Sequence, residues 1–149
     1  MDVRVEQREP VRGAALRLEG EVTPEGIGRT WGRLLLKCDG LAAAGPAFGL
    51  RHGEGAYEAC WALPPGAPLP GGLLETEAPG GWYAATIHAG TYDRIEETLR
   101  RLLEEWLPGG GFRRREGPIV ERYLVDPREG TEADLRTEIS IPVQPDPVK

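Results

Sequence analysis

The chain has 149 residues, of which 40% are hydrophobic and 28% charged, and its formal net charge at pH 7 is −6. These values predict one globular domain over residues 1–149, large enough to fold without disulfides or metals. The negative charge argues against nucleic acid as a partner, because phosphate binding requires a basic surface. The N-terminus has no signal-peptide pattern, and no apolar run is long enough to span a membrane. We therefore expect a cytoplasmic protein.

Metal and cofactor chemistry is not indicated by the residues that usually carry it. Cys38 and Cys60 lie in apolar stretches without zinc-site spacing, so we expect buried thiols. His52 and His88 are far apart and lack the partners of a nucleophilic triad. The glycine run 109–111 lacks the lysine of a phosphate-binding loop. The sequence thus predicts no cofactor and no metal site.

The first half of the chain reads as strands around one helix. Polar and apolar residues alternate over 2–7 and 11–18, which predicts two strands. Thr23 is placed to cap a helix that begins at Pro24 and ends near Leu36. Two further strands, 47–51 and 57–63, are joined by a short turn. A loop rich in proline and glycine, residues 64–72, then leads to the second half.

The second half predicts the same kinds of element. Strands are expected over 73–78 and 82–88, followed by a helix from Tyr92 or Asp93 to Leu107, capped by Thr91 or Asp93. Two strands, 118–125 and 136–143, flank a polar loop from Asp126 to Asp134. The arginines at 113–115 are interpreted as a solvated loop. Residues 144–149 are expected to be a frayed tail.

The two halves repeat one pattern. The helix positions Ile27, Trp31, Leu34, Leu35 and Cys38 recur at identical spacing as Ile95, Leu99, Leu102, Leu103 and Trp106. We therefore expect two strand-helix-strand-strand modules, at about 2–64 and about 73–143, that share a core. The seam between them is the natural place for a small-molecule ligand.

Three glutamates in the middle of predicted strands are the candidate charged groups. Strand alternation places Glu121 with Tyr123, Glu138 with Ser140, and Glu58 with Cys60. We expect Glu58, Glu121 and Glu138 to face one open side of the sheet, although glutamate is disfavoured in strands. An acidic site with aromatic walls attracts organic cations. The aromatic candidates are Tyr123, Tyr92, Trp82 and Tyr57.

An alternative interpretation assigns these side chains no ligand. The face can simply be solvated, with its acids paired to Arg51, Arg122 or Arg136. The aromatic candidates can equally be packing residues whose hydroxyl or indole groups find partners. Trp31 and Trp106 lie on the helix stripes and are interpreted as core residues.

A family resemblance rests on several short segments in a fixed order. They are residues 79–84, 88–92, 118–127, 135–139 and 141–143, with a looser match at 14–17, Gly20, Trp31, Leu34 and 57–60. In these segments the chain resembles the GyrI-like small-molecule-binding family, which is also the effector-binding domain of multidrug-responsive bacterial transcription activators. One departure is Gly49-Leu50, where family members commonly carry a tyrosine, so one wall of the site is expected to be less aromatic.

The resemblance implies an α+β fold of two pseudo-twofold-related strand-helix-strand-strand modules. It also implies an antiparallel sheet with two helices on one face and a ligand cleft on the other. Family members bind amphipathic, often cationic molecules, and this chain is expected to be a stand-alone binder whose ligand contacts Glu121, Glu138 and Tyr123. Two alternatives stay open. One is a hydrolase of cyclopropane-bearing toxins in which Glu121 activates water and Tyr123 orients the substrate, and the other is a protein-interaction role such as gyrase modulation.

Overall fold

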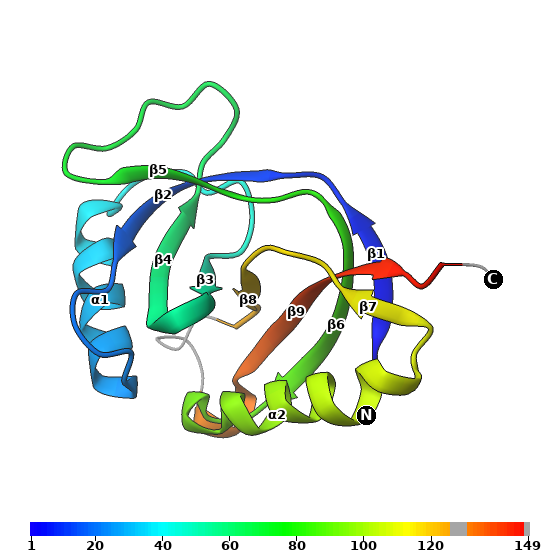
Figure 1. The fold of residues 1–149 in the computed structure, drawn as a ribbon. Helices are drawn as coiled ribbons and strands as arrows, with labels where there is room; N and C mark the ends of the chain where they lie inside the picture. Colours follow the sequence, from blue (N-terminus) through cyan, green and yellow to red (C-terminus); the bar gives the residue numbers. More distant parts are fainter. Residues whose placement is uncertain (126–130, 148–149) are drawn as a thin grey trace.

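A long two-stranded ribbon gives the sheet its shape in the computed structural model, which describes residues 1–125 and 131–147 (Figure 1). One side of the ribbon is β1 (Arg4–Arg8) and β2 (Val11–Arg17), and the other is β5 (Leu74–Ala78) and β6 (Gly81–Ala89). A single register runs through both pairs, from Arg4 opposite Ala85 to Val11 opposite Ala78. At the bend, Gly80 lies against Arg8 and Pro10 so closely that a Cβ would contact both at 3.0 Å. Glycine therefore allows the ribbon to bend there.

The remaining strands complete an antiparallel sheet with internal symmetry. They are β3 (Phe48–His52), β4 (Ala56–Ala62), β8 (Ile119–Tyr123) and β9 (Arg136–Pro145). The strand order is β1-β6-β9-β8-β3-β4-β2-β5. Outward from the seam between β8 and β3, each side presents the second, third and first strand of its module: β3, β4 and β2 on one side, and β8, β9 and β6 on the other. The predicted α+β fold of two related modules is confirmed.

Both helices pack on one side of this sheet, which we call the outer face. Helix α1 (Pro24–Lys37) begins at Thr23, whose hydroxyl accepts a hydrogen bond from the backbone N–H of Gly26 at 3.1 Å, as predicted. Its Leu34 packs against the aromatic and small residues of β4. The second helical segment comprises η2 (Tyr92–Arg94), α2 (Ile95–Arg101), a π-helical turn η3 (Leu102–Trp106) and η4 (Leu107–Gly109). It packs on β9, but neither predicted cap makes a side-chain cap hydrogen bond.

The opposite side of the sheet, the inner face, is enclosed. The long ribbon arches over it, with β5 and β6 passing across the top and right of Figure 1. The enclosed residues are mostly apolar: Ala15, Phe48, Leu50, Cys60, Ala62, Ala78, Tyr83 and Val120. Burial of this apolar surface stabilises the closed shape. Glu58 and Glu138, which lie on this face, are consequently buried.

Two segments differ from the sequence prediction. Residues Phe112–Arg114 form a short strand, β7, that pairs with the end of β9, whereas the arginine run was interpreted as a loop. Because of this pairing β9 continues to Pro145, so residues 144 and 145 are strand rather than frayed tail. In the predicted polar loop, Glu132–Asp134 form a 3₁₀ turn, η5. Residues 126–130 of that loop and residues 148–149 of the tail lie outside the described residues.

Candidate functional site on the outer face

Glu121 is the centre of a polar cluster at the seam between the modules. It lies on β8 opposite Gly49 of β3 and Ile139 of β9, and this register directs its side chain to the outer face. The residue is only 1% exposed. Its Oε1 accepts a hydrogen bond from the Tyr123 hydroxyl at 2.9 Å, and its Oε2 accepts one from Nε of Arg51. A buried carboxylate thus meets one guanidinium and one hydroxyl.

A chain of hydrogen bonds leads from helix α1 to this carboxylate. The indole N–H of Trp31 donates to the Tyr57 hydroxyl at 2.7 Å, and the hydroxyls of Tyr57 and Tyr123 are 2.8 Å apart. Since the one hydroxyl proton of Tyr123 is donated to Glu121, Tyr57 is the donor to Tyr123. All donors in the chain therefore point toward the Glu121 carboxylate.

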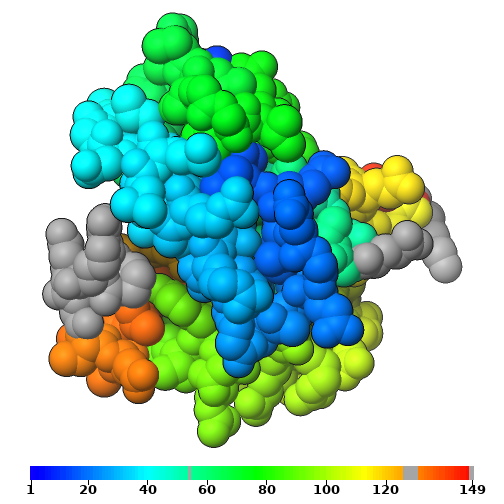
Figure 2. All heavy atoms as spheres, turned by 90° about the vertical axis from the view of Figure 1, so that its left-hand side faces the viewer, coloured from blue at the N-terminus to red at the C-terminus, as the bar shows by residue number. Residues whose placement is uncertain are grey.

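Aromatic rings from both helical segments meet over β8. Trp31 of α1 contacts Tyr123 edge-on with ring centroids 5.0 Å apart, and Tyr92 of η2 does so at 5.6 Å. Edge-to-face contacts of this kind are favourable. Figure 2 looks onto this side of the molecule, where the blue and light-blue atoms of α1 lie above the lime-green atoms of α2. Tyr123 therefore joins the two modules on the outer face.

Tyr57 also supplies the aromatic wall that the Gly49-Leu50 pair was expected to lack. A Cβ built on Gly49 would overlap the Tyr57 hydroxyl and come within 2.9 Å of the adjoining ring carbon. The ring of Tyr57 thus lies over the glycine, and a side chain at position 49 would displace it. An aromatic residue from the neighbouring strand occupies this part of the site.

Burial sets the protonation of the tyrosine hydroxyls. It raises the pKa of both Tyr57 and Tyr123, and the negative charge of Glu121 raises both further. For Arg51, burial opposes the charged form, but the adjacent Glu121 carboxylate outweighs it and raises the pKa of the guanidinium. The two hydroxyls are therefore neutral donors at pH 7, beside a charged arginine.

A cavity of about 340 Å³ adjoins the Arg51 end of this cluster. It lies between Val22, just before α1, the turn after β3, and Glu96 of α2. Arg51, whose side chain is 17% exposed, forms part of its wall. Its Nη1 lies 3.7 Å from an Oε1 oxygen of Glu96, a residue whose side chain is 80% exposed. Arg51 thus lines the cavity and also binds the buried carboxylate.

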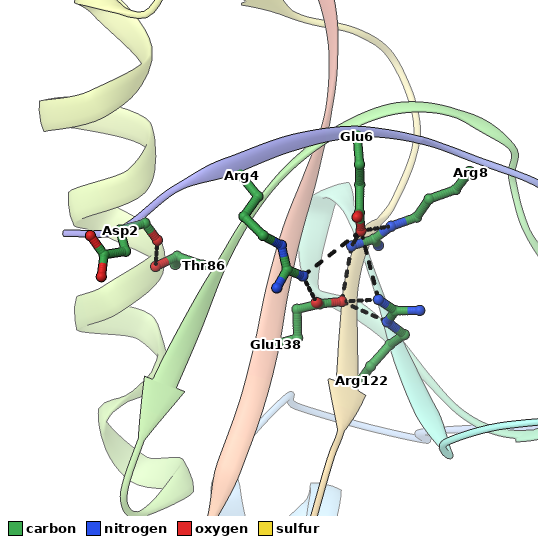
Figure 3. A network of polar contacts seen from close by, with 7 residues as sticks. All are labelled: Asp2, Arg4, Glu6, Arg8, Thr86, Arg122 and Glu138. Carbon is green, nitrogen blue, oxygen red and sulfur yellow. Dashed lines mark hydrogen bonds and ion pairs between the residues drawn. The ribbon is translucent and has the colours of Figure 1, made fainter.

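Glu138 occupies a different environment on the inner face (Figure 3). It is 2% exposed and lies opposite Arg122 of β8. Its Oε1 accepts hydrogen bonds from Nε of Arg122 at 2.6 Å and from Arg8 at 2.9 Å, and its Oε2 accepts one from Arg4. Glu6 adds a second carboxylate, 2.7 Å from Arg8. Three guanidinium groups therefore enclose the Glu138 carboxylate and tie β1 to β8 and β9.

The other two predicted site residues also lie away from Glu121. Glu58 is on the inner face, 5% exposed, and contacts the Thr76 hydroxyl at 3.1 Å, His52 at 3.0 Å and Arg17 at 3.5 Å. Trp82 lies on β6, two strands from β8, and is 39% exposed. Among the described residues, no three histidine, cysteine, aspartate or glutamate side chains converge as metal ligands would.

The expectation that Glu58, Glu121 and Glu138 share one open face is wrong. Alternation within each strand is as predicted, but the register between β8 and β9 places Glu121 and Glu138 on opposite faces. Arg122 rather than Glu121 lies opposite Glu138, and an offset of one residue reverses the face of every side chain. The structure brings Glu121 together with Tyr123, Tyr57 and Tyr92 on the outer face. The alternative pairing of acids with Arg51 and Arg122 is confirmed.

Two members of the cluster were not among the predicted site residues. Trp31 was interpreted as core, yet its indole N–H begins the hydrogen-bond chain. The repeat could have indicated this role, because the matching position of the second module is Leu99, which has no hydrogen-bonding group in its side chain. Arg51 was considered only as a neutralising partner, and nothing in the sequence indicated that it borders a cavity.

Residues 51–144 match the family model of the GyrI-like small molecule binding domain. The chain belongs to this family. It is 30% identical over 158 aligned positions to a DNA gyrase inhibitor of Erwinia billingiae, covering 96% of this chain and 97% of that protein. A probable transcriptional regulator YgiV of Escherichia coli K12 is 33% identical over 72 residues, which cover 48% of this chain and 45% of YgiV. The match thus spans less than half the length of YgiV.

Solved structures of GyrI-like proteins share the fold. The C-terminal domain of EcmrR superposes with a TM-score of 0.81 at 18% identity, covering 97% of this chain and 98% of that domain. SAV2435, whose structure was solved bound to tetraphenylphosphonium, superposes with a TM-score of 0.64 at 16% identity, covering 97% and 94%. At such identities the likeness establishes the fold. No described helix of the chain has the length and apolar character needed to cross a membrane.

Proposed function

We propose that this GyrI-like chain binds amphipathic organic cations at the seam between its modules. Glu121 supplies the counter-charge, and the rings of Tyr57, Tyr92 and Tyr123 supply the walls. The observation that carries the proposal is a buried carboxylate bonded to Tyr123, whose ring contacts aromatic rings from both helical segments. Inside a protein, where the dielectric constant is low, such a charge attracts a poorly hydrated cation strongly, and aromatic faces add to the attraction.

The fold supports the same ligand class. SAV2435 has this fold and was solved with tetraphenylphosphonium, a lipophilic cation. In our proposal Glu138 and Glu58 hold the inner face together and contact no ligand, because three guanidinium groups enclose Glu138 and Glu58 is buried on the same enclosed face. Trp82 likewise lies too far around the sheet to form a wall of this site.

Binding is favoured over hydrolysis by the state of Glu121. A general base must present an oxygen to the water that it activates. Both Glu121 oxygens instead accept hydrogen bonds, one from Arg51 and one from Tyr123. A hydrolase would therefore need a rearrangement that frees one of these oxygens for water. A binding protein needs only the loss of the Arg51 contact, because the ligand's cation takes its place.

We place this binding function in the cytoplasm, without a role for nucleic acid. Both cysteines are buried and free, as a reducing compartment favours. The net charge of −6 gives no attraction for phosphate backbones. A protein partner, such as the gyrase named for the Erwinia relative, is the competing function.

The test is a thermal-shift screen with tetraphenylphosphonium and cationic dyes. The variants are Glu121→Gln and, as a matched control, Glu75→Gln, which removes an exposed glutamate paired with Arg12. A ligand that binds the native state raises the melting temperature by mass action. We expect a shift in the wild type and in Glu75→Gln that is lost in Glu121→Gln. The absence of any shift in all three folded proteins would contradict the proposal and favour a protein partner.

A further inference from the structure

Arg51 occupies the position that a cationic ligand needs. Its Nε contacts Oε2 of Glu121, while the other carboxylate oxygen is held by the neutral Tyr123 hydroxyl. Its guanidinium carbon is also 5.9 Å from the centre of the Tyr57 ring, within reach of a cation–π contact. Arg51 therefore already occupies the Glu121 carboxylate and one face of the Tyr57 ring, the two groups that would bind a cationic ligand.

We propose that Arg51 is an internal competitor, so that ligand binding exchanges one cation for another at Glu121. This inference rests on the proposed function, because it assumes that a cation binds at this seam. The structure supplies both things that an exchange needs, which are room beside the guanidinium and a second partner for it.

The room is the cavity of about 340 Å³ that Arg51 borders. Because Arg51 both lines this cavity and contacts Glu121, turning the guanidinium away opens the cavity toward the carboxylate. A cation in the cavity then reaches Glu121. The Tyr123 hydroxyl stays on the other oxygen, so the carboxylate keeps one hydrogen bond throughout.

The second partner is Glu96 on α2. Its carboxylate is already 3.7 Å from Nη1 of Arg51, and its side chain is 80% exposed. A displaced Arg51 therefore moves toward solvent and remains paired with a negative charge. The exchange avoids an unpaired charge in the protein at every stage, which is the costly alternative.

This arrangement determines which ligands bind. A neutral aromatic molecule gains nothing at Glu121 that compensates for the displaced guanidinium, so it is rejected. An organic cation replaces the positive charge of the guanidinium, and competition with Arg51 lowers the apparent affinity of the ligand. Arg51 is thus a specificity-determining residue of the seam rather than only a structural partner of Glu121.

Calorimetric titration of tetraphenylphosphonium tests the exchange. In Arg51→Met, which keeps the apolar stem and removes the charge, we expect tetraphenylphosphonium to bind about tenfold more tightly. The neutral analogue triphenylphosphine oxide no longer has to displace a guanidinium in this variant, so its binding is expected to rise from undetectable to measurable. Placing Arg51→Met in a Glu121→Gln background is expected to abolish the gain. An unchanged or weaker affinity of folded Arg51→Met for the cation would overturn the inference.

A second variant covers the case in which Arg51→Met does not fold. Glu96→Gln removes only an exposed carboxylate, and it is expected to weaken tetraphenylphosphonium binding about threefold, the size of a surface charge interaction. The matched control is Glu97→Gln, one residue along α2 and paired with Arg94. Equal effects of the two variants would contradict the inference.

The failure of the exchange can be told apart from the failure of the proposed function. If folded wild type binds no cation, the proposed function fails. If it binds in a Glu121-dependent way that Arg51 and Glu96 do not alter, only the exchange fails.

Discussion

The two buried glutamates of the central strands, Glu121 and Glu138, are held in opposite ways. Glu138 on the inner face is enclosed by three guanidinium groups that join β1, β8 and β9. Glu121 on the outer face has one guanidinium, one hydroxyl and a cavity beside them. A carboxylate surrounded by fixed partners holds strands together, whereas one with a single displaceable partner beside free space can take a ligand. Burial alone therefore does not identify a binding residue.

The largest effect on stability is expected at Glu138. Replacing it with glutamine removes the buried carboxylate that three guanidinium groups share and leaves them only the partly exposed Glu6, and removing one partner of a buried ion pair costs about 3–5 kcal/mol. Chemical denaturation measures the loss of unfolding free energy. The control is Glu75→Gln, which breaks an exposed ion pair with Arg12 and is expected to lose at most about 1 kcal/mol. The folded variant should keep its response to tetraphenylphosphonium. Loss of that response would place Glu138 in the site.

A smaller loss of stability is expected at Glu121, together with loss of binding. Glu121→Gln deprives one guanidinium of this carboxylate rather than three, and Arg51 still has Glu96 at 3.7 Å, so we expect a loss of about 1.5–3 kcal/mol in total. Denaturation should therefore show a smaller change than in Glu138→Gln, whereas calorimetry should show no cation binding. If the two variants had the same effects on both measurements, the distinction between the two glutamates would be lost.

Gly49 tests the packing of Tyr57 over the seam. In Gly49→Ala the new methyl group overlaps the Tyr57 hydroxyl, and overpacking of this kind costs about 1–3 kcal/mol. The control is Gly28→Ala on α1, where a Cβ meets nothing within 4 Å and the helix gains about 0.5–1 kcal/mol. The two variants should shift the melting temperature in opposite directions. A neutral Gly49→Ala would show that Tyr57 does not need to occupy this space.

The smallest expected effect is at alkaline pH. Burial raises the folded-state pKa of Tyr57 and Tyr123 above the unfolded value of about 10, so their contribution to stability is present below that pH and is lost as pH rises further. We expect the melting temperature to fall above this point, and to fall less in Tyr57→Phe. Tyrosinate absorbance of the folded protein should show fewer than four tyrosines ionising at a pH of about 10, because burial also raises the pKa of Tyr83. An equal alkaline loss in wild type and Tyr57→Phe would contradict this assignment.

Much of the fold follows from the sequence because its patterns are local. The repeat of helix positions predicted two modules, and Thr23 with Pro24 predicted the start of α1. The pairing of strands far apart in sequence is not local. Nothing in residues 119–123 or 136–145 shows that Arg122 rather than Glu121 lies opposite Glu138, and that offset separates the predicted site into two clusters. The ribbon that closes the inner face depends on a register of the same kind.

The central claim is that a ligand's cation replaces Arg51 at Glu121, and a crystal structure of the chain with tetraphenylphosphonium tests it most directly. We predict the phosphonium between α1 and α2, against Glu121 and the rings of Tyr57 and Tyr123, with Arg51 turned toward Glu96. A phosphonium bound elsewhere on the molecule, with Arg51 still paired to Glu121, would contradict the account.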